Sequence, residues 1–151
     1  MTTISKILFP TDFSSSSDYG LHYATSLARD NQASLLIVHV EEPPAMYGGG
    51  EMYYGVPEPD TAALTTMLEQ VKPDDPQVRH EHRLIVGNPA DKIVAVAKEE
   101  QADLIVMGTY GRTGLVRLLF GSVAEAVVRR APCPVLTFKA PELPKGSESQ
   151  S

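Results

Sequence analysis

Short apolar runs alternate with amphipathic segments along most of this chain. Five segments are predicted to be strands, and the apolar runs within them are brief and have the character of buried strands. They lie at residues 6–10, 33–40, 78–87, 102–108 and 133–139. Between them, apolar side chains recur at the three- and four-residue spacing of one helix face. The pattern therefore predicts five strands that alternate with four helices.

The helical segments carry recognisable start signals. The first follows a serine-rich turn, in which Ser15 and Asp18 have the spacing of a capping box, and it ends at residues 29–32. The third begins with Asn88 as the N-cap and Pro89 at the first helical position. The second and the fourth cover about residues 60–71 and 122–131.

Regular alternation of strands and helices predicts the α/β fold class, with a single doubly wound parallel sheet and helices on both faces. In such sheets, ligands bind beyond the carboxyl ends of the strands, at the point where the strand order reverses. The loops that begin at Pro10, Val40, Gly87 and Gly108 are therefore the places to look for function.

Composition narrows the class of protein further. With 151 residues, of which 42% are hydrophobic, the chain suits one folded domain, and we assign it to residues 1–140. Residues 141–151 lack apolar side chains for packing and are expected to form a mobile tail. The net charge of −6, without a basic cluster, argues against nucleic acid and anionic membranes as partners.

Compartment and topology can also be predicted. Cys133 is the only cysteine in the sequence, so no internal disulfide is expected and a reducing compartment fits. The first residues do not have the pattern of a secretory signal, and no apolar run is long enough to span a membrane. We therefore expect a cytoplasmic protein.

Residues 108–122, GTYGRTGLVRLLFGS, form a glycine-rich segment between the fourth strand and the fourth helix. Backbone amides at a glycine-rich turn and at a helix N-terminus favour phosphate, and Arg112 can add a fork of donors. The structural alternative is that Gly108 and Gly111 only make a tight turn, while Ser122 and Glu125 form a capping box. The segment matches neither of the two commonest phosphate-loop patterns.

The spacing within this segment resembles the ATP-binding branch of the universal stress protein family. The pattern reads G-x-x-G, nine residues, then G-S, and it consists of Gly108, Gly111, Gly121 and Ser122. The resemblance extends from KILFPTDFS through LLIVHV and DLIVMG to PCPVLTF. It implies a five-stranded parallel sheet of order 3-2-1-4-5, in agreement with the predicted alternation.

The resemblance also implies the roles of individual residues at the base and the sugar. Asp12 would accept hydrogen bonds from the ribose hydroxyls, with Pro10 and Thr11 lining that wall. Val40 would pair with adenine through its backbone. A structural alternative for Asp12 is that it begins a turn or caps the next helix.

Further positions would hold the phosphates. Met107 and Gly108 would contact the sugar and the first phosphate. The outer phosphates would be bound by Gly111, Arg112, Thr113 and Gly114 and by Gly121, Ser122 and Val123. Mg²⁺ or Mn²⁺ would be carried by the phosphates, since the matching positions offer no protein cage for a metal. The ligand implied is ATP, with AMP and other adenine nucleotides left open.

The function expected is a stress-response or regulatory module that binds ATP and hydrolyses it slowly at most, because no general base is evident. The resemblance also implies a homodimer through the last strand, at about residues 134–138, which would cover an exposed sheet edge. One alternative is a flavodoxin-like protein that binds FMN through TDFSSSS, and another is a nucleotide-free dimeric interaction module of the same fold. A receiver domain is set aside because Asp12 has no acidic neighbour after the first strand.

Four other features of the sequence are candidates for function. His39 lies within an apolar strand and is interpreted as a core histidine, and His80 and His82 as an exposed strand start in preference to a metal site. Cys133, between two prolines, is interpreted as structural. The loop at residues 41–59, with its glycines and tyrosines, is equally compatible with a lid and with a surface insert.

Overall fold

The computed structural model describes residues 3–43, 60–109 and 121–139. Five strands and four helices alternate along these residues, as predicted. In chain order they are β1 (Lys6–Pro10), α1 (Ser15–Asn31), β2 (Ser34–Glu41), α2 (Thr61–Glu69), β3 (His80–Val86), α3 (Pro89–Glu99), β4 (Leu104–Gly108), α4 (Ser122–Arg130) and β5 (Val135–Phe138). No helix within this part of the chain is long and apolar enough to cross a membrane.

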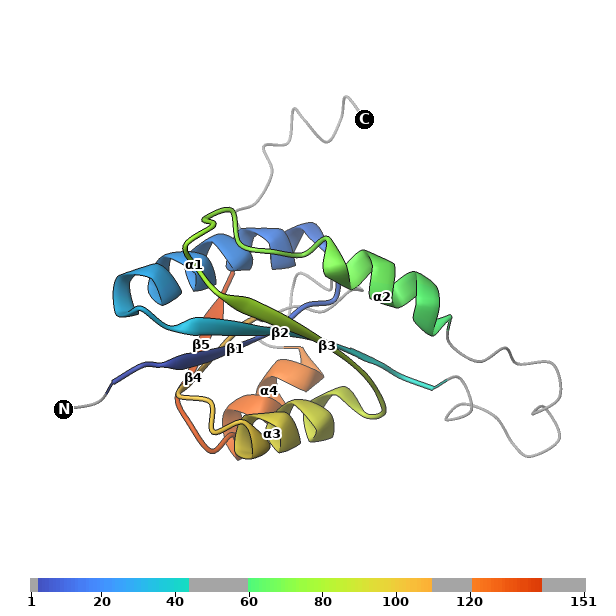
Figure 1. Ribbon diagram of the computed structural model, residues 1–151. Helices are drawn as coiled ribbons and strands as arrows, with labels where there is room; N and C mark the ends of the chain where they lie inside the picture. Colours follow the sequence, from blue (N-terminus) through green and yellow to red (C-terminus); the bar gives the residue numbers. More distant parts are fainter. Residues whose placement is uncertain (1–2, 44–59, 110–120, 140–151) are drawn as a thin grey trace, which may run out of the picture.

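The strands form one parallel sheet of order β3-β2-β1-β4-β5, which confirms the predicted fold class and strand order. Helices α1 and α2 cover one face of the sheet, and α3 and α4 cover the other (Figure 1). The order reverses between β1 and β4, because the chain proceeds from β1 to one edge and from β4 to the other.

Alternate side chains of each central strand enter different hydrophobic cores. In β1, Ile7 and Phe9 pack on the side of α1, whereas Leu8 packs on the side of α3 and α4. All three are fully buried. Burial on both faces explains why these strands appear in the sequence as continuous apolar runs.

The boundaries of the first and third helices have local causes. The N-cap of helix α1 lies one residue before Ser15: it is Ser14, whose hydroxyl accepts a hydrogen bond from the amide of Ser17. The Ser15–Asp18 capping box is therefore wrong, because four consecutive serines offer equivalent caps. The Asn88 cap is confirmed, since its side chain accepts from the amide of Asp91 and Pro89 is the first helical residue.

The amino ends of the strands are held together by charged side chains. One carboxylate oxygen of Asp103 accepts hydrogen bonds from the amides of Ser5 and Lys6, at 2.8 and 3.0 Å. Glu100 bridges Lys6 of β1 and Arg83 of β3 through ion pairs of 2.9 Å. The contacts of Asp103 and Lys6 lie at the end of the sheet opposite the carboxyl ends of the strands, and Arg83 reaches Glu100 from the middle of β3.

Candidate functional site

The strand order places the expected ligand crevice at the carboxyl ends of β1 and β4. Helix α1 follows β1 onto one face of the sheet, whereas α4 follows β4 onto the other, so the two connections diverge (Figure 1). Thr11 and Asp12 lie at one side of this crevice, and Gly108, Gly121 and Ser122 lie at the other. Pro10 and Met107 are the adjacent strand residues.

Hydrogen bonds hold the loop after β1 in one conformation. Oδ1 of Asp12 accepts from the amide of Ser14 at 3.0 Å and from the hydroxyl of Ser17 at 2.8 Å. Through Oδ1, Asp12 therefore has the turn-forming role that was the structural alternative. The other carboxylate oxygen has no partner among the described residues, so a turn role and a ligand role for Asp12 are compatible.

Phe13, the next residue of this loop, has a backbone conformation that the sequence analysis did not predict. Its φ of 66° lies in the left-handed region, which is uncommon for a bulky residue. Its amide donates to the hydroxyl of Thr11 at 3.1 Å, and its ring lies 4.4 Å from the ring of His39 between centroids. The residue type at this position does not signal the turn; the hydrogen bond to Thr11 and the ring contact with His39 accompany it.

His39 is buried, as predicted for a core histidine, and both its ring nitrogens are hydrogen-bonded. Nδ1 lies 2.8 Å from the carbonyl oxygen of Thr11, and Nε2 lies 2.7 Å from a carboxylate oxygen of Glu41. The side chain is 2% exposed. This histidine therefore contacts the backbone of the loop after β1 directly.

Val40 presents its backbone toward the same crevice. In a parallel strand, the amide and the carbonyl of one residue point to the same neighbour, and the direction alternates from residue to residue. Ser34 and Val38 both bond to the β1 side, through Ser5 and Thr11, whereas Glu41 bonds to Gly87 after β3. By this alternation the amide and the carbonyl of Val40 point toward the β1 side of β2. Because β1 ends at Pro10, which pairs with Val38, no β1 residue pairs with Val40.

The ends of the glycine-rich segment lie side by side. The amide of Gly121 donates to the carbonyl of Thr109 at 2.6 Å, and the amide of Thr109 donates to the carbonyl of Phe138 at 3.1 Å. The chain therefore returns to the end of β4 before α4 begins. Thr109, which the sequence analysis did not identify, therefore links the start of the segment to its end through the amide of Gly121. Its predicted phosphate residues Gly111, Arg112, Thr113 and Gly114 lie outside the described residues.

Helix α4 begins without a side-chain cap. Gly121 is the N-cap, and its carbonyl accepts from the amide of Glu125 at 3.0 Å, so Ser122 is already the first helical residue. The expected Ser122–Glu125 capping box is therefore wrong, because the cap is Gly121, which has no side chain to form one. The amides of Ser122 and Val123 have no acceptor in the first helical turn. Together with the helix dipole, they favour an anion at this end of α4.

The remaining candidate residues lie away from the crevice. His82 Nε2 lies 2.6 Å from the carbonyl oxygen of Val71, and its ring is 5.2 Å from that of His80 between centroids. Among the described residues, no group of three His, Cys, Asp or Glu side chains is arranged to hold a metal. Burial, and to a lesser extent the Asp103 carboxylate, raises the pKa of Cys133, in keeping with a structural thiol.

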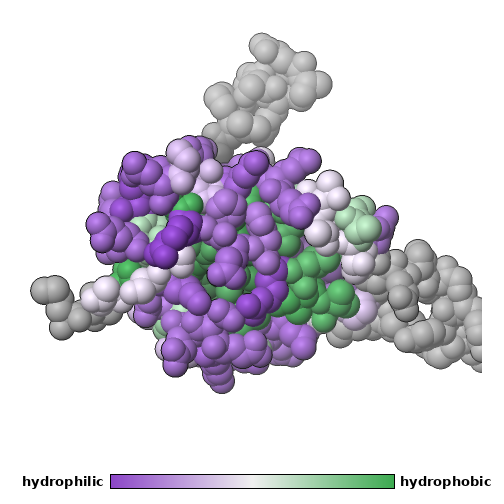
Figure 2. Space-filling view, viewed as in Figure 1, coloured by the Kyte–Doolittle hydropathy of each residue, from purple (hydrophilic) through white to green (hydrophobic). Residues whose placement is uncertain are grey.

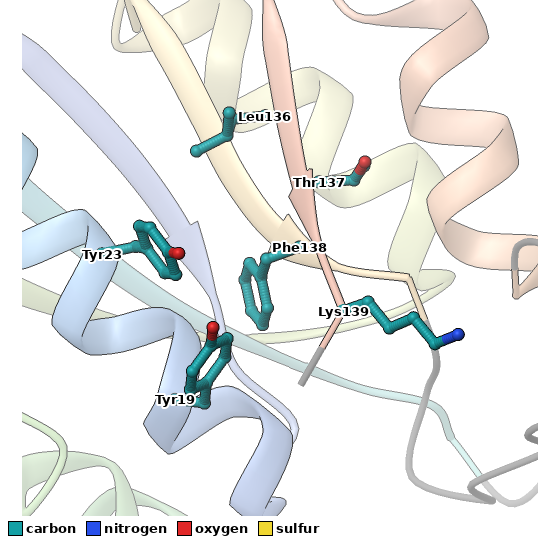
Figure 3. Close-up of a pocket in the computed structure, with 6 residues that line it drawn as sticks. All are labelled: Tyr19, Tyr23, Leu136, Thr137, Phe138 and Lys139. Carbon is teal, nitrogen blue, oxygen red and sulfur yellow. The ribbon is translucent and has the colours of Figure 1, made fainter. Parts of the chain in front are cut away.

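A hollow of about 240 Å³ lies between α1 and the edge strand β5 (Figure 3). Tyr19 and Tyr23 of α1 line one side, and the ring of Phe138 points between them. A hydrogen bond of the Tyr19 hydroxyl with Tyr23, and then burial, raise the pKa of Tyr19. Leu136 beside them is 39% exposed, so this sheet edge carries an accessible apolar side chain.

Comparisons with known proteins agree with this geometry. The model of the universal stress protein family matches residues 3–139. The universal stress protein MJ0531 of Methanocaldococcus jannaschii is 34% identical over 148 residues, covering 91% of this chain and 83% of its own.

Two solved structures are similar throughout the chain. The structure of MJ0577 from the same organism has a TM-score of 0.74 at 26% identity, covering 94% of this chain and all of its own. A universal stress protein in complex with cAMP has a TM-score of 0.69 at 26% identity, covering 91% and 98%. The likeness therefore covers most of the chain.

Proposed function

Because this chain belongs to the universal stress protein family, we propose that it binds ATP in the crevice between β1 and β4. The observation that carries the proposal is the convergence of three groups at this edge of the sheet. They are the outward-facing backbone of Val40, the second carboxylate oxygen of Asp12 and the uncapped N-terminus of α4.

The base and the sugar would lie over the end of β1. An adenine ring offers an acceptor, N1, beside a donor, the N6 amino group, and these complement the amide and carbonyl of one strand residue. Val40 supplies such a pair. Asp12 is held by Ser14 and Ser17 through one oxygen, so its other oxygen is positioned to accept from the ribose hydroxyls.

The phosphates would lie on the β4 side of the crevice, away from the carboxylate of Asp12. Gly121, Ser122 and Val123 would provide backbone amides and a hydroxyl, and Gly108 would allow close approach. Gly111, Arg112, Thr113 and Gly114 would complete the phosphate site. Mg²⁺ or Mn²⁺ would bind chiefly to the phosphate oxygens, with water as its other ligands.

We expect bound ATP to be hydrolysed slowly at most. His39 is buried with both ring nitrogens engaged, and Asp12 holds the loop after β1. Neither group is arranged as a base for water at the phosphates. The protein would then act through its ATP-bound and ATP-free states, as a regulatory module. The cAMP complex of a relative makes other adenine nucleotides the natural competitors.

The proposal is tested by heating the purified protein, identifying any released nucleotide, and titrating the stripped protein with ATP, AMP, cAMP and FMN in a calorimeter. We expect ATP to bind and to raise the melting temperature. Asp12→Asn should weaken ATP binding about tenfold, because a hydrogen bond to a charged group contributes about 1.5–3 kcal/mol. The exposed Asp18→Asn, on the first turn of α1, is the matched control.

Gly111→Val tests the phosphate side in the same assay, and it should abolish tight binding. A yellow protein that binds FMN would favour the flavodoxin-like alternative. A protein that binds no nucleotide, and whose melting temperature ATP does not change, would contradict the proposal and leave the nucleotide-free interaction module.

We also propose that two copies associate through β5. This edge strand carries the exposed Leu136 beside Tyr19 and Tyr23, whereas the opposite edge, β3, carries the charged residues Glu81 and Arg83, which discourage pairing. Figure 2 shows a largely hydrophilic face, with hydrophobic side chains toward the carboxyl end of β3, where Val86 is 42% exposed.

The two edges provide a matched pair of variants. Leu136→Glu should convert a dimer to a monomer in sedimentation equilibrium at micromolar concentration, whereas Val86→Glu should not. A monomeric wild type would contradict this association.

A further inference from the structure

The hydrogen-bond ladder between β1 and β2 ends with the bond from the amide of Thr11 to the carbonyl of Val38. The amide of Ser34 donates to the carbonyl of Ser5 at 3.0 Å, and the amide of Thr11 donates to the carbonyl of Val38 at 2.8 Å. The next bond in a parallel ladder would join the amide of Val40 to the carbonyl of Thr11. In the part of the chain that the structure describes, that bond is absent.

The side chain of His39 occupies that carbonyl instead. Its Nδ1 lies 2.8 Å from the carbonyl oxygen of Thr11. A carbonyl oxygen only accepts hydrogen bonds, so Nδ1 must carry a proton and donate it. The hydrogen bond that would have belonged to the backbone of one residue is therefore made by the side chain of the residue before it.

The imidazole ring of His39 is fixed from three directions. Nε2 lies 2.7 Å from a carboxylate oxygen of Glu41, two residues along the same face of β2. The ring of Phe13 lies against it, with 4.4 Å between centroids. Rotation of the ring would break both hydrogen bonds in a site that is 2% exposed, so the donor at Nδ1 is held in place.

We propose that His39 is a positioning residue that ends the pairing of β1 with β2 and thereby keeps the backbone of Val40 available to a nucleotide base. This inference rests on the proposed function. By holding the carbonyl of Thr11, the histidine also fixes the start of the loop that carries Asp12. One side chain thus organises both the base end and the sugar end of the crevice.

If His39 had only a structural role, different results would be expected. An apolar side chain of similar size would fill the same space, and the carbonyl of Thr11 would then be left to the amide of Val40. The fold would remain, with a longer β1–β2 ladder, while the amide of Val40 would be bonded to β1 and no longer available to the base. The role proposed here therefore separates ligand affinity from stability.

Two variants make that separation measurable. His39→Phe keeps a ring but removes the donor, and it should weaken ATP binding about tenfold, the effect of one or two lost hydrogen bonds. His39→Asn keeps an N–H donor near the position of Nδ1 and should bind ATP within a few-fold of the wild type. Melting temperatures of the free proteins, measured alongside, report on stability alone.

Amide hydrogen exchange in the free protein tests the same point without a ligand. In the wild type, the amide of Val40 should exchange much faster than that of Val38, because it has no acceptor in the ladder. In His39→Phe it should become protected. If the wild-type Val40 amide is protected as well as that of Val38, the proposal is overturned, even if the Phe variant does not fold.

The binding outcomes distinguish this inference from the proposed function. A wild type that binds no adenine nucleotide overturns the proposed function and, with it, the role of His39 in binding. A wild type that binds ATP, with a Phe variant that binds equally well, overturns only the role of His39. Equal losses in the Phe and Asn variants would show that the N–H donor is not what positions the site.

Discussion

Gly20 leaves the space that the ring of Phe138 occupies. A β-carbon at Gly20 would lie 1.9 Å from Cζ of that ring, far inside van der Waals contact. Gly20 lies within α1 and Phe138 ends β5, so this contact sets how closely the helix approaches the edge strand. The same ring lines the hollow with Tyr19 and Tyr23 (Figure 3).

Gly20→Ala should destabilise the protein, although alanine is the better helix former. The helical preference would contribute about 1 kcal/mol in favour of alanine, whereas overpacking costs about 1–3 kcal/mol and here involves a ring packed against backbone. Urea unfolding provides the measurement. In a Phe138→Ala background the same change should be neutral or stabilising, and equal effects in both backgrounds would contradict the steric account.

A substitution at Thr25 is expected to raise the stability of the protein. Its hydroxyl is buried on α1 and has no hydrogen-bond partner among the described residues. Thr25→Val removes the unsatisfied oxygen and keeps the shape, so it should stabilise the fold by about 1 kcal/mol. Thr66→Val is the matched control, because the exposed hydroxyl of Thr66 donates to the carbonyl of Ala62. A loss of stability in Thr25→Val alone would show that the hydroxyl has a partner.

Glu100 should make stability depend on pH in the acidic range. Hydrogen bonds from Lys6, and then from Arg83, lower the pKa of this carboxyl below its usual value. A carboxyl with a lowered folded-state pKa contributes stability above its unfolded pKa, and this is lost as the pH falls through the folded value. Glu100→Gln should therefore be less stable than the wild type near neutral pH.

The difference between Glu100→Gln and the wild type should shrink as the pH falls below about 4.3, the ordinary pKa of glutamate. Urea unfolding of both proteins from pH 7 down to pH 3 measures it. The neighbouring Glu99→Gln, at an exposed position, should show no such convergence. A difference that stays constant with pH would rule out the two ion pairs as its source.

Much of this fold could be predicted because its strands are buried on both faces. Runs such as the one that contains Ile7, Leu8 and Phe9 have no polar interruption, and helices separate them at regular intervals. Strand order followed from the family resemblance. The predicted helix caps were wrong by one residue at α1 and α4. At each start, two adjacent residues can both serve as a cap: Ser14 and Ser15 at α1, and Gly121 and Ser122 at α4.

The arrangement around Thr11 could not be predicted, because it depends on contacts between distant residues. His39 was correctly interpreted as buried and hydrogen-bonded, yet its partner is a backbone carbonyl 28 positions away. Phe13 adopts a positive φ that nothing in its residue type indicates. Such side chain to backbone contacts arise only when β1 and β2 are already side by side, so local patterns carry no signal for them.

The central claim is that one nucleotide contacts both β2 and α4 across the crevice. A titration of isotope-labelled protein with ATP and Mg²⁺, followed through its backbone amide resonances, tests this most directly. We predict that the amides of Val40, Ser122 and Val123 shift together and saturate with a single dissociation constant, while that of Leu136 does not move. Saturable shifts confined to another surface, or none at the two predicted ends, would contradict the account.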